Sequence, residues 1–284
     1  MSMQSRPGGG RVVLLTGAAG GIGTAITQAL LGDGHFVAAV DKSESALSRL
    51  SLVCGRSDVS ERLCPILADL ADAAACLDAV AAAAARFGRV DAVINNAGIG
   101  VSSLRPDAEL RHPAIEELTA EIWDRFFDVN VRAPMLVTRA ALPEMKRRGW
   151  GRIVNNTTSF RTMLRVLPYG ATKAALESMS AVWAQELEGS GITVNVLIPG
   201  GPTDTAFIAE GSGWPRDRML RPQVMGPPAR WLVSDESGAT TGQRIVAGRW
   251  DASLPGLQAA ARAARAIGWP ELAADAVWLA EKPA

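Results

Sequence analysis

The chain has 284 residues and a mass of 29.8 kDa, enough for a large hydrophobic core without disulfides or a structural metal. Its 29 basic residues balance 29 acidic ones, so charge does not favour nucleic acid as a partner. The longest uninterrupted apolar run, 79–85, is far shorter than the ~20 residues that cross a bilayer. These features predict a cytoplasmic protein without a membrane segment.

The cysteines and histidines lack the short spacings of a disulfide framework or a zinc site. They are Cys54, Cys64, Cys76, His35 and His112. We therefore expect no metal, and any redox chemistry should come from an organic cofactor.

In chain order, residues 1–10 end in a run of glycines that predicts a disordered arm. From residue 11, short β-rich runs alternate with stretches of helical spacing, as in parallel strands joined by crossover helices. Seven strands are expected, at 12–15, 36–40, 64–67, 92–95, 152–155, 193–198 and 244–247. Helices are expected at 21–31, 43–52, 72–87, 122–148, 168–188 and 223–234. The pattern predicts a doubly wound parallel α/β sheet over residues 11–248.

The chain changes character after residue 248. An Ala- and Arg-rich stretch at 257–267 and a shorter one at 270–281 both have helical spacing. We expect residues 249–284 to form a helical tail that packs on the domain or on a neighbouring subunit.

A glycine-rich turn follows the first strand and leads into the first helix. It reads Thr16-Gly17-Ala18-Ala19-Gly20-Gly21-Ile22-Gly23. Backbone N–H groups and the dipole at such a helix start attract a pyrophosphate, and glycines let it approach the main chain. A nucleotide-kinase loop would end in Gly-Lys-Ser/Thr, which this turn lacks. The order of strand, glycines and helix predicts a dinucleotide site.

Asp41 ends the second strand, 18 residues after Gly23. A carboxylate there can accept hydrogen bonds from ribose hydroxyls and repel a 2′-phosphate, which favours NAD over NADP. Lys42 follows directly and could soften that preference. The alternative is that Asp41 only caps the next helix, although Ser43 is a better cap.

Tyr169 is the only tyrosine, and Lys173 follows four residues later on a helix opened by Pro168. Positions four apart share a helix face. Bringing a phenol pKa from near 10 toward 7 takes about 4 kcal/mol. A cation ~4 Å away supplies about that much at an effective dielectric near 20. The pair is therefore a candidate for acid–base chemistry, the alternative being a solvated helix face.

Four motifs occur in the chain: the glycine-rich turn at 16–23, Asn95-Asn96-Ala97-Gly98, the Tyr169/Lys173 pair and Pro199-Gly200. In order and spacing they resemble those of the short-chain dehydrogenase/reductase family. The resemblance covers roughly residues 11–248 and includes Thr241-Gly242-Gln243 before the last strand. It implies a seven-stranded Rossmann-type sheet and a homotetramer or homodimer. It also implies hydride transfer between NAD(P) and an alcohol or carbonyl.

The resemblance assigns Tyr169 as general acid/base and Lys173 as the group that lowers its pKa and binds the nicotinamide ribose. Asn130 corresponds to the asparagine that holds a water in the proton relay, or it is a buried amide that satisfies helix carbonyls. Thr158 aligns with the catalytic serine, but lies two residues closer to the tyrosine than is usual in the family. Ser159 is the reserve candidate.

The implied dinucleotide site includes Asp69 at the adenine amine. Either Thr203 or Thr205 would meet the carboxamide. The full set is Gly17, Gly20, Gly21, Ile22, Asp41, Asp69, Leu70, Asn96, Ala97, Gly98, Tyr169, Lys173, Pro199, Gly200, Pro202, Thr203 and Thr205.

We expect an NAD-dependent oxidoreductase that interconverts a secondary alcohol and a ketone, with Thr158 polarising the substrate oxygen. Oxidation is the expected physiological direction. The alternatives are an NADP-dependent carbonyl reductase and a non-catalytic, dinucleotide-binding regulatory protein.

Segments 99–104, 160–167 and 207–220, the last containing Trp214, should line the substrate pocket. Within them Met163, Leu164, Val166, Leu167 and Phe207 predict an apolar cavity. Two further residues of the second segment, Arg161 and Arg165, could anchor a carboxylate or be solvated. The gap between Gly98 and Asn130 exceeds the family norm, and we expect its extra residues, 105–113, to form a lid or rim.

Overall fold

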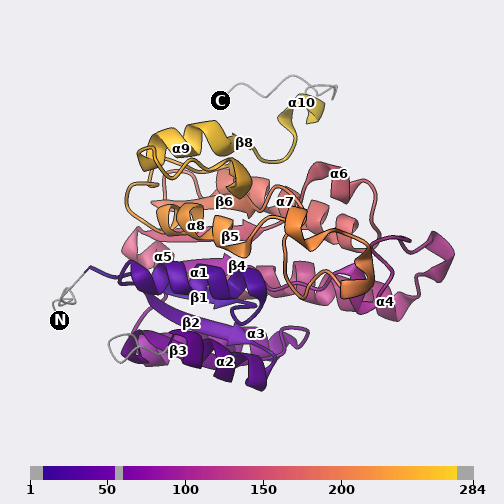
Figure 1. Ribbon diagram of the computed structural model, residues 1–284. Helices are drawn as coiled ribbons and strands as arrows, with labels where there is room; N and C mark the ends of the chain where they lie inside the picture. The colour runs from indigo at the N-terminus through magenta and orange to yellow at the C-terminus, as the bar shows by residue number, and fades with distance from the viewer. Residues whose placement is uncertain (1–8, 55–59, 274–284) are drawn as a thin grey trace.

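The computed structural model describes residues 9–54 and 60–273, which fold around one eight-stranded sheet (Figure 1). Its strand order is β3-β2-β1-β4-β5-β6-β7-β8. The strands are β1 (Val12–Thr16), β2 (Phe36–Asp41), β3 (Leu63–Leu67), β4 (Ala92–Asn95), β5 (Gly151–Asn156), β6 (Ile192–Ile198), β7 (Gln243–Val246) and β8 (Ala264–Ala266). The first seven pair in parallel, so the predicted doubly wound parallel sheet is confirmed.

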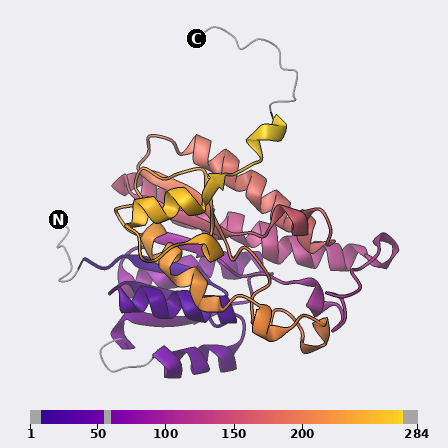
Figure 2. The same cartoon turned by 45° about the horizontal axis from the view of Figure 1, so that its top comes forward.

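Helices cover both faces of the sheet (Figure 2). One face packs against α1 (Gly21–Gly32), α2 (Glu44–Cys54), α8 (Gly226–Leu232) and α9 (Gly256–Ala263). The other packs against α3 (Ala73–Phe87), α5 (Ala133–Arg148) and α7 (Tyr169–Glu186). Within β1, Val13 and Leu15 enter the first core, whereas Val12 and Leu14 enter the second. Burial on both faces explains why the strands read as continuous apolar runs.

Shorter elements complete the described chain. The single-turn helices are η1 (Ser60–Arg62), η2 (Val101–Ser103), η3 (Ile115–Glu117), η5 (Glu210–Ser212), η6 (Arg216–Arg218), η7 (Pro222–Met225), η8 (Ala247–Arg249), α6 (Phe160–Met163) and α10 (Pro270–Ala273). Within the described ranges, every helix is too short or too polar to cross a membrane.

The single helix expected at 122–148 is interrupted. It consists of α4 (Ala120–Phe127), a π-helical turn η4 (Asp128–Arg132), and α5. The turn contains the fully buried Asn130, whose Oδ1 accepts from the Ile99 N–H at 2.9 Å and whose Nδ2 donates to the Ile99 carbonyl at 3.0 Å. The widened turn thus directs one amide at the loop after β4, and such π-bulges often occur at functional sites.

The tail is not entirely helical, which corrects the sequence prediction. Helix α9 ends at Ala263, and residues 264–266 form β8, antiparallel to β7. A free strand edge offers unpaired N–H and C=O groups, and pairing with it overrides the helical propensity of alanine and arginine. Most of the helix expected at 270–281 lies outside the described residues, as do residues 1–8 of the expected arm. Gly10 is buried against Gly34.

The strand order reverses between β1 and β4. From β1, the sheet grows toward β2 and β3 on one side and toward β4 to β8 on the other. Open α/β sheets bind ligands at such a reversal, outside the carboxyl ends of the strands. The fold therefore points to the turns after β1 and β4 as the edge of a binding site.

Candidate active site

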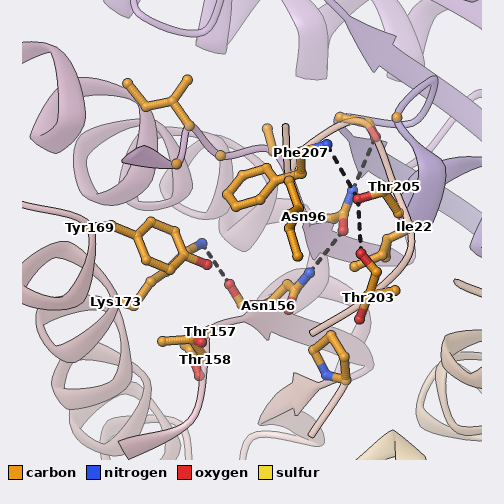
Figure 3. A pocket seen from close by; sticks show the side chains of 18 of the residues that line it. Ile22, Asn96, Asn156, Thr157, Thr158, Tyr169, Lys173, Thr203, Thr205 and Phe207 are labelled. Carbon is orange, nitrogen blue, oxygen red and sulfur yellow. Dashed lines mark hydrogen bonds between the residues drawn. The ribbon is translucent and has the colours of Figure 1, made fainter. Parts of the chain in front are cut away.

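A cavity of about 690 Å³ lies at the carboxyl ends of β1 to β6 (Figure 3). Every residue that the sequence predicted for the dinucleotide lines it, from Gly17 after β1 to Thr205 after β6. Thr158 lines it too, whereas Asn130 lies behind the wall and its neighbour Val129 reaches the cavity. One cavity thus unites all but one of the predicted site residues.

The glycine-rich turn has a shape that side chains would prevent. Gly17 has a φ of +62°, in the left-handed region that glycine tolerates. A Cβ at Gly23 would lie 2.0 Å from the Gly17 carbonyl oxygen and 2.7 Å from the Ala18 Cα. Helix α1 begins here without a side-chain cap or an acidic residue in its first turn. Its free N–H groups can therefore receive an anion from the cavity.

Asp41 ties this turn to the end of β2. Its carboxylate accepts from the N–H groups of Ala19 and Ser43, each at 3.1 Å. Ser43 Oγ accepts from the Ala46 N–H at 3.2 Å, so Ser43 caps α2. An ionised carboxylate has about four acceptor positions, which leaves Asp41 capacity for hydroxyl donors in the cavity. Lys42 lines the same cavity.

The turn after β4 is fastened to the turn after β1. Thr16 Oγ1 accepts from the N–H groups of Asn96 and Ala97, both at 3.0 Å. In return, Asn96 Nδ2 donates to the Gly17 carbonyl at 3.0 Å. These bonds hold the two strand ends of the topological reversal together.

Tyr169 begins α7 and faces the cavity, with its ring 5.7 Å from that of Phe207. Burial raises the pKa of its phenol above the ordinary value; a hydrogen bond with Thr158 partly opposes this, and the charge of Glu109 adds to it. Ser159, by contrast, caps α6, since its Oγ accepts from the Thr162 N–H at 3.1 Å. Of the two candidate hydroxyls, only that of Thr158 pairs with the phenol.

Lys173 is buried one turn further along α7. Its Nζ donates to the Asn156 carbonyl at 2.8 Å and lies 5.8 Å from the centre of the Tyr169 ring. Burial lowers the pKa of this ammonium to about 8. That Lys173 lowers the pKa of Tyr169 stays a prediction. In the protein alone, burial of the phenol outweighs any help from the ammonium.

Asn130 acts on the cavity wall from behind. Besides its two bonds to Ile99, it donates to Thr172 Oγ1 at 3.0 Å. A Cβ placed on Gly98 would meet Asn130 Oδ1 at 3.1 Å and Lys173 Nζ at 3.4 Å, so both groups lie close behind that glycine. The amide satisfies a loop rather than helix carbonyls.

Sequence reasoning missed a buried ion pair beside the reactive groups. Glu177 accepts from Arg244 Nε at 2.8 Å and from Thr157 Oγ1 at 2.7 Å, while Arg244 Nη1 donates to the Thr158 carbonyl at 2.9 Å. The pair fixes the backbone that carries the Thr158 hydroxyl. The sequence does contain a signal for Glu177, because this residue follows Lys173 by four positions and so shares a helix face with Lys173 and Tyr169.

The substrate side of the cavity combines apolar and polar residues, and its apolar lining includes Ile99, Val101, Ile208 and the predicted Trp214. Val166 and Phe207 line it, but the lining does not include Met163, Leu164 or Leu167. Charged and polar residues lie there as well, namely Glu109, His112, Arg161 and Arg165. The first two come from the 105–113 segment, which forms part of the wall.

A protein-family model described as short chain dehydrogenase matches residues 11–214. The chain belongs to the short-chain dehydrogenase/reductase family. It is accordingly an NAD(P)-dependent oxidoreductase, and its cavity contains the glycine turn and the strand-end residues that a nicotinamide dinucleotide requires.

Among the relatives of this short-chain dehydrogenase/reductase is a short-chain type dehydrogenase/reductase of Picea abies, 31% identical over 80% of this chain and 87% of the relative. Another is D-threitol dehydrogenase of Mycolicibacterium smegmatis, 31% identical over 84% of this chain and 91% of the relative. A solved structure, 3-ketoacyl-(acyl-carrier-protein) reductase from Brucella melitensis complexed with NADH, is 28% identical. It has a TM-score of 0.70 and covers 84% of this chain and 98% of its own.

Proposed function

We propose that this enzyme interconverts a secondary alcohol and a ketone, with NAD as cofactor. The observation that supports this most directly is the convergence of Tyr169, Thr158 and Lys173 on the cavity that also holds the glycine turn. When bound, the dinucleotide supplies the hydride acceptor or donor. The protein supplies placement, a proton carrier and a hydroxyl for the substrate oxygen.

Proton transfer falls to Tyr169. With its pKa raised, the phenol holds its proton at neutral pH and can give it to a carbonyl oxygen during reduction. In oxidation the same oxygen must first lose that proton, and the alcohol proton then moves to it. The Thr158 hydroxyl bonds to the phenol and would donate to the substrate oxygen as charge develops there.

We propose the preference for NAD because of Asp41. Its remaining acceptor capacity suits two ribose hydroxyls, whereas a 2′-phosphate would meet a carboxylate. The NADH in the Brucella relative is in line with this proposal. Lys42 supports the alternative, an NADP-dependent carbonyl reductase, because this basic residue lines the same cavity.

Thr203 is the better candidate for the nicotinamide carboxamide. Thr205 lies over the phosphate turn, since a Cβ on Gly21 would meet Thr205 Cγ2 at 2.4 Å. Thr203 is buried and paired in register with Leu220. In Figure 3 both threonines face Tyr169 and Lys173 from across the cavity.

The test combines two variants. Tyr169→Phe should abolish oxidation of secondary alcohols yet leave the NAD dissociation constant within a few-fold, as measured by calorimetry. Asp41→Ala should lower the ratio of kcat/KM for NAD to that for NADP at least tenfold, with Lys42→Ala as the matched control that moves it the other way. Undiminished turnover by Tyr169→Phe would show that Tyr169 is not the general acid/base. NAD binding by the wild type without turnover of a broad alcohol panel would favour the regulatory alternative.

Two further proposals concern the whole protein. A homodimer or homotetramer, and a cytoplasmic location, stay predictions from the family and from composition. Light scattering of the purified protein checks the first.

A further inference from the structure

The segment 105–113 is a fixed part of the cavity wall. Arg105 forms ion pairs with Asp107 at 3.1 Å and with Glu117 at 2.9 Å, which brace the segment from outside. Ala108 is fully buried against Val101, Val166 and Tyr169. On its far side, Leu110 lies against Gly213 in the loop that carries Phe207. The side chains that this segment directs inward are therefore held in place.

Glu109 is the first of these inward groups. It is partly buried, and within the described chain its only hydrogen bond comes from Ser102 Oγ at 3.3 Å. Its side chain lines the same cavity as Tyr169, and the adjacent Ala108 packs against Tyr169. Most of its acceptor capacity remains free for a ligand in the cavity.

His112 is the second. Its Nδ1 lies 3.1 Å from the Ala108 carbonyl, and because a carbonyl only accepts, that nitrogen carries the proton. In the neutral ring Nε2 is then an acceptor. Both inward groups can therefore accept hydrogen bonds from donors on the ligand, which a plain hydrocarbon does not offer.

We propose that this enzyme takes a polyhydroxylated alcohol, with Glu109 and His112 accepting hydrogen bonds from hydroxyls that neighbour the reacting carbon. The proposal rests on the alcohol–ketone function above and names its substrate class. A neutral polyol also suits Arg161 and Arg165, two exposed residues that line the same cavity and whose side chains have no hydrogen-bond or ion-pair partner among residues 9–54 and 60–273. These cations disfavour the other donor ligand, an ammonium, and can donate to hydroxyl oxygens.

The test compares 2,3-butanediol with 2-butanol, which differ by one hydroxyl on the same carbon chain. The wild type should oxidise the diol with at least tenfold higher kcat/KM. Glu109→Ala should lower kcat/KM for the diol at least tenfold more than that for 2-butanol, and His112→Ala should act in the same direction. Glu109→Gln, which keeps an acceptor oxygen, should retain most of the diol preference. Glu116→Ala, an exposed change in the following turn, is the matched control.

Equal loss on both alcohols in Glu109→Ala would show a general effect on Tyr169 and overturn the proposal, as would a wild-type ratio near one. Higher kcat/KM for 1-amino-2-propanol than for the diol would assign the acceptors to an amine instead. If the wild type oxidises none of these alcohols, the alcohol–ketone function fails by itself. Saturation-transfer NMR of diol and mono-ol binding to the NAD-loaded protein then decides the role of Glu109, because it needs no turnover.

Discussion

At the scale of single residues, the hydroxyls of Thr158 and Ser159 are adjacent in sequence but do different work. The hydrogen bond from Thr158 lowers the pKa of Tyr169, against the larger effect of burial. The Ser159 oxygen holds the first turn of α6. Thr158 thus affects the reaction and Ser159 affects local stability, and substitutions at the two positions should have different effects.

Thr158→Val should lower kcat for alcohol oxidation roughly 10²-fold, the usual effect of removing one donor to a reacting oxygen. It should also move the pH–rate curve to higher pH, because the Tyr169 pKa rises and less phenolate is present at a given pH. Steady-state kinetics from pH 6 to the alkaline limit of stability measure both effects. Thr158→Ser should stay within a few-fold of the wild type.

Ser159→Ala is the matched comparison. It should cost about 1 kcal/mol of unfolding free energy through the lost cap while leaving the pH–rate curve in place. A shift of that curve in Ser159→Ala, with none in Thr158→Val, would reverse the assignment of the two hydroxyls.

The Tyr169 and Lys173 pair was predictable from spacing alone, whereas the direction of the phenol pKa was not. Spacing puts two side chains on one helix face, but the pKa depends on burial by residues such as Val101 and Ala108, which are distant in sequence. The inward direction of Glu109 and His112 was hidden for the same reason. It follows from contacts between the 105–113 segment and loops far along the chain.

At the scale of elements, the predicted first and last residues of all seven parallel strands lie within one residue of those in the structure. Strands covered on both faces consist of consecutive apolar residues, so the apolar runs mark where the strands begin and end. The π-turn and β8 were missed because each depends on a remote partner. Asn130 bonds to Ile99, and β8 pairs with β7. The spacing of apolar residues within a segment does not predict such pairings with distant segments.

The Glu177–Arg244 pair joins α7 to β7 beneath Thr158 and yields an element-scale prediction. Arg244→Met should cost roughly 3–5 kcal/mol of unfolding free energy, because it leaves the fully buried Glu177 carboxylate without its cation. Adding Glu177→Met should restore most of that loss in urea denaturation. Activity should stay low in the double variant, since the Thr158 carbonyl has still lost its donor. If stability falls further in the double variant, the pair is net stabilising and the argument is wrong.

At the scale of the whole molecule, the buried Lys173 ammonium makes stability depend on pH. Its pKa is about 8 in the native state, against about 10.4 for an unfolded lysine. Between those values the unfolded chain binds more protons, so the free energy of unfolding rises with pH, by about 3 kcal/mol across the window. Below pH 8 both states are protonated and the buried charge is a constant cost.

Lys173→Met should therefore gain stability relative to the wild type at pH 7 and lose that advantage by about pH 10.4. Chemical denaturation at several pH values measures the difference between the two proteins, which cancels the other ionisable groups. Lys146→Met, at an exposed position of α5, is the matched control variant. A pH-independent difference for Lys173→Met would mean that the native ammonium is not perturbed.

Strand β8 has a consequence for how copies of this chain can meet. It occupies the side of β7 that would otherwise bind a foreign strand, and β3 at the opposite margin contains Pro65, which lacks an N–H. A chain ending at Ala263 should associate with rising concentration in light scattering, whereas one ending at Ala273 should behave as the full chain does. Because β8 covers β7 and Pro65 removes one N–H from the β3 margin, we expect any oligomer to form through helices and loops rather than by pairing of sheet edges.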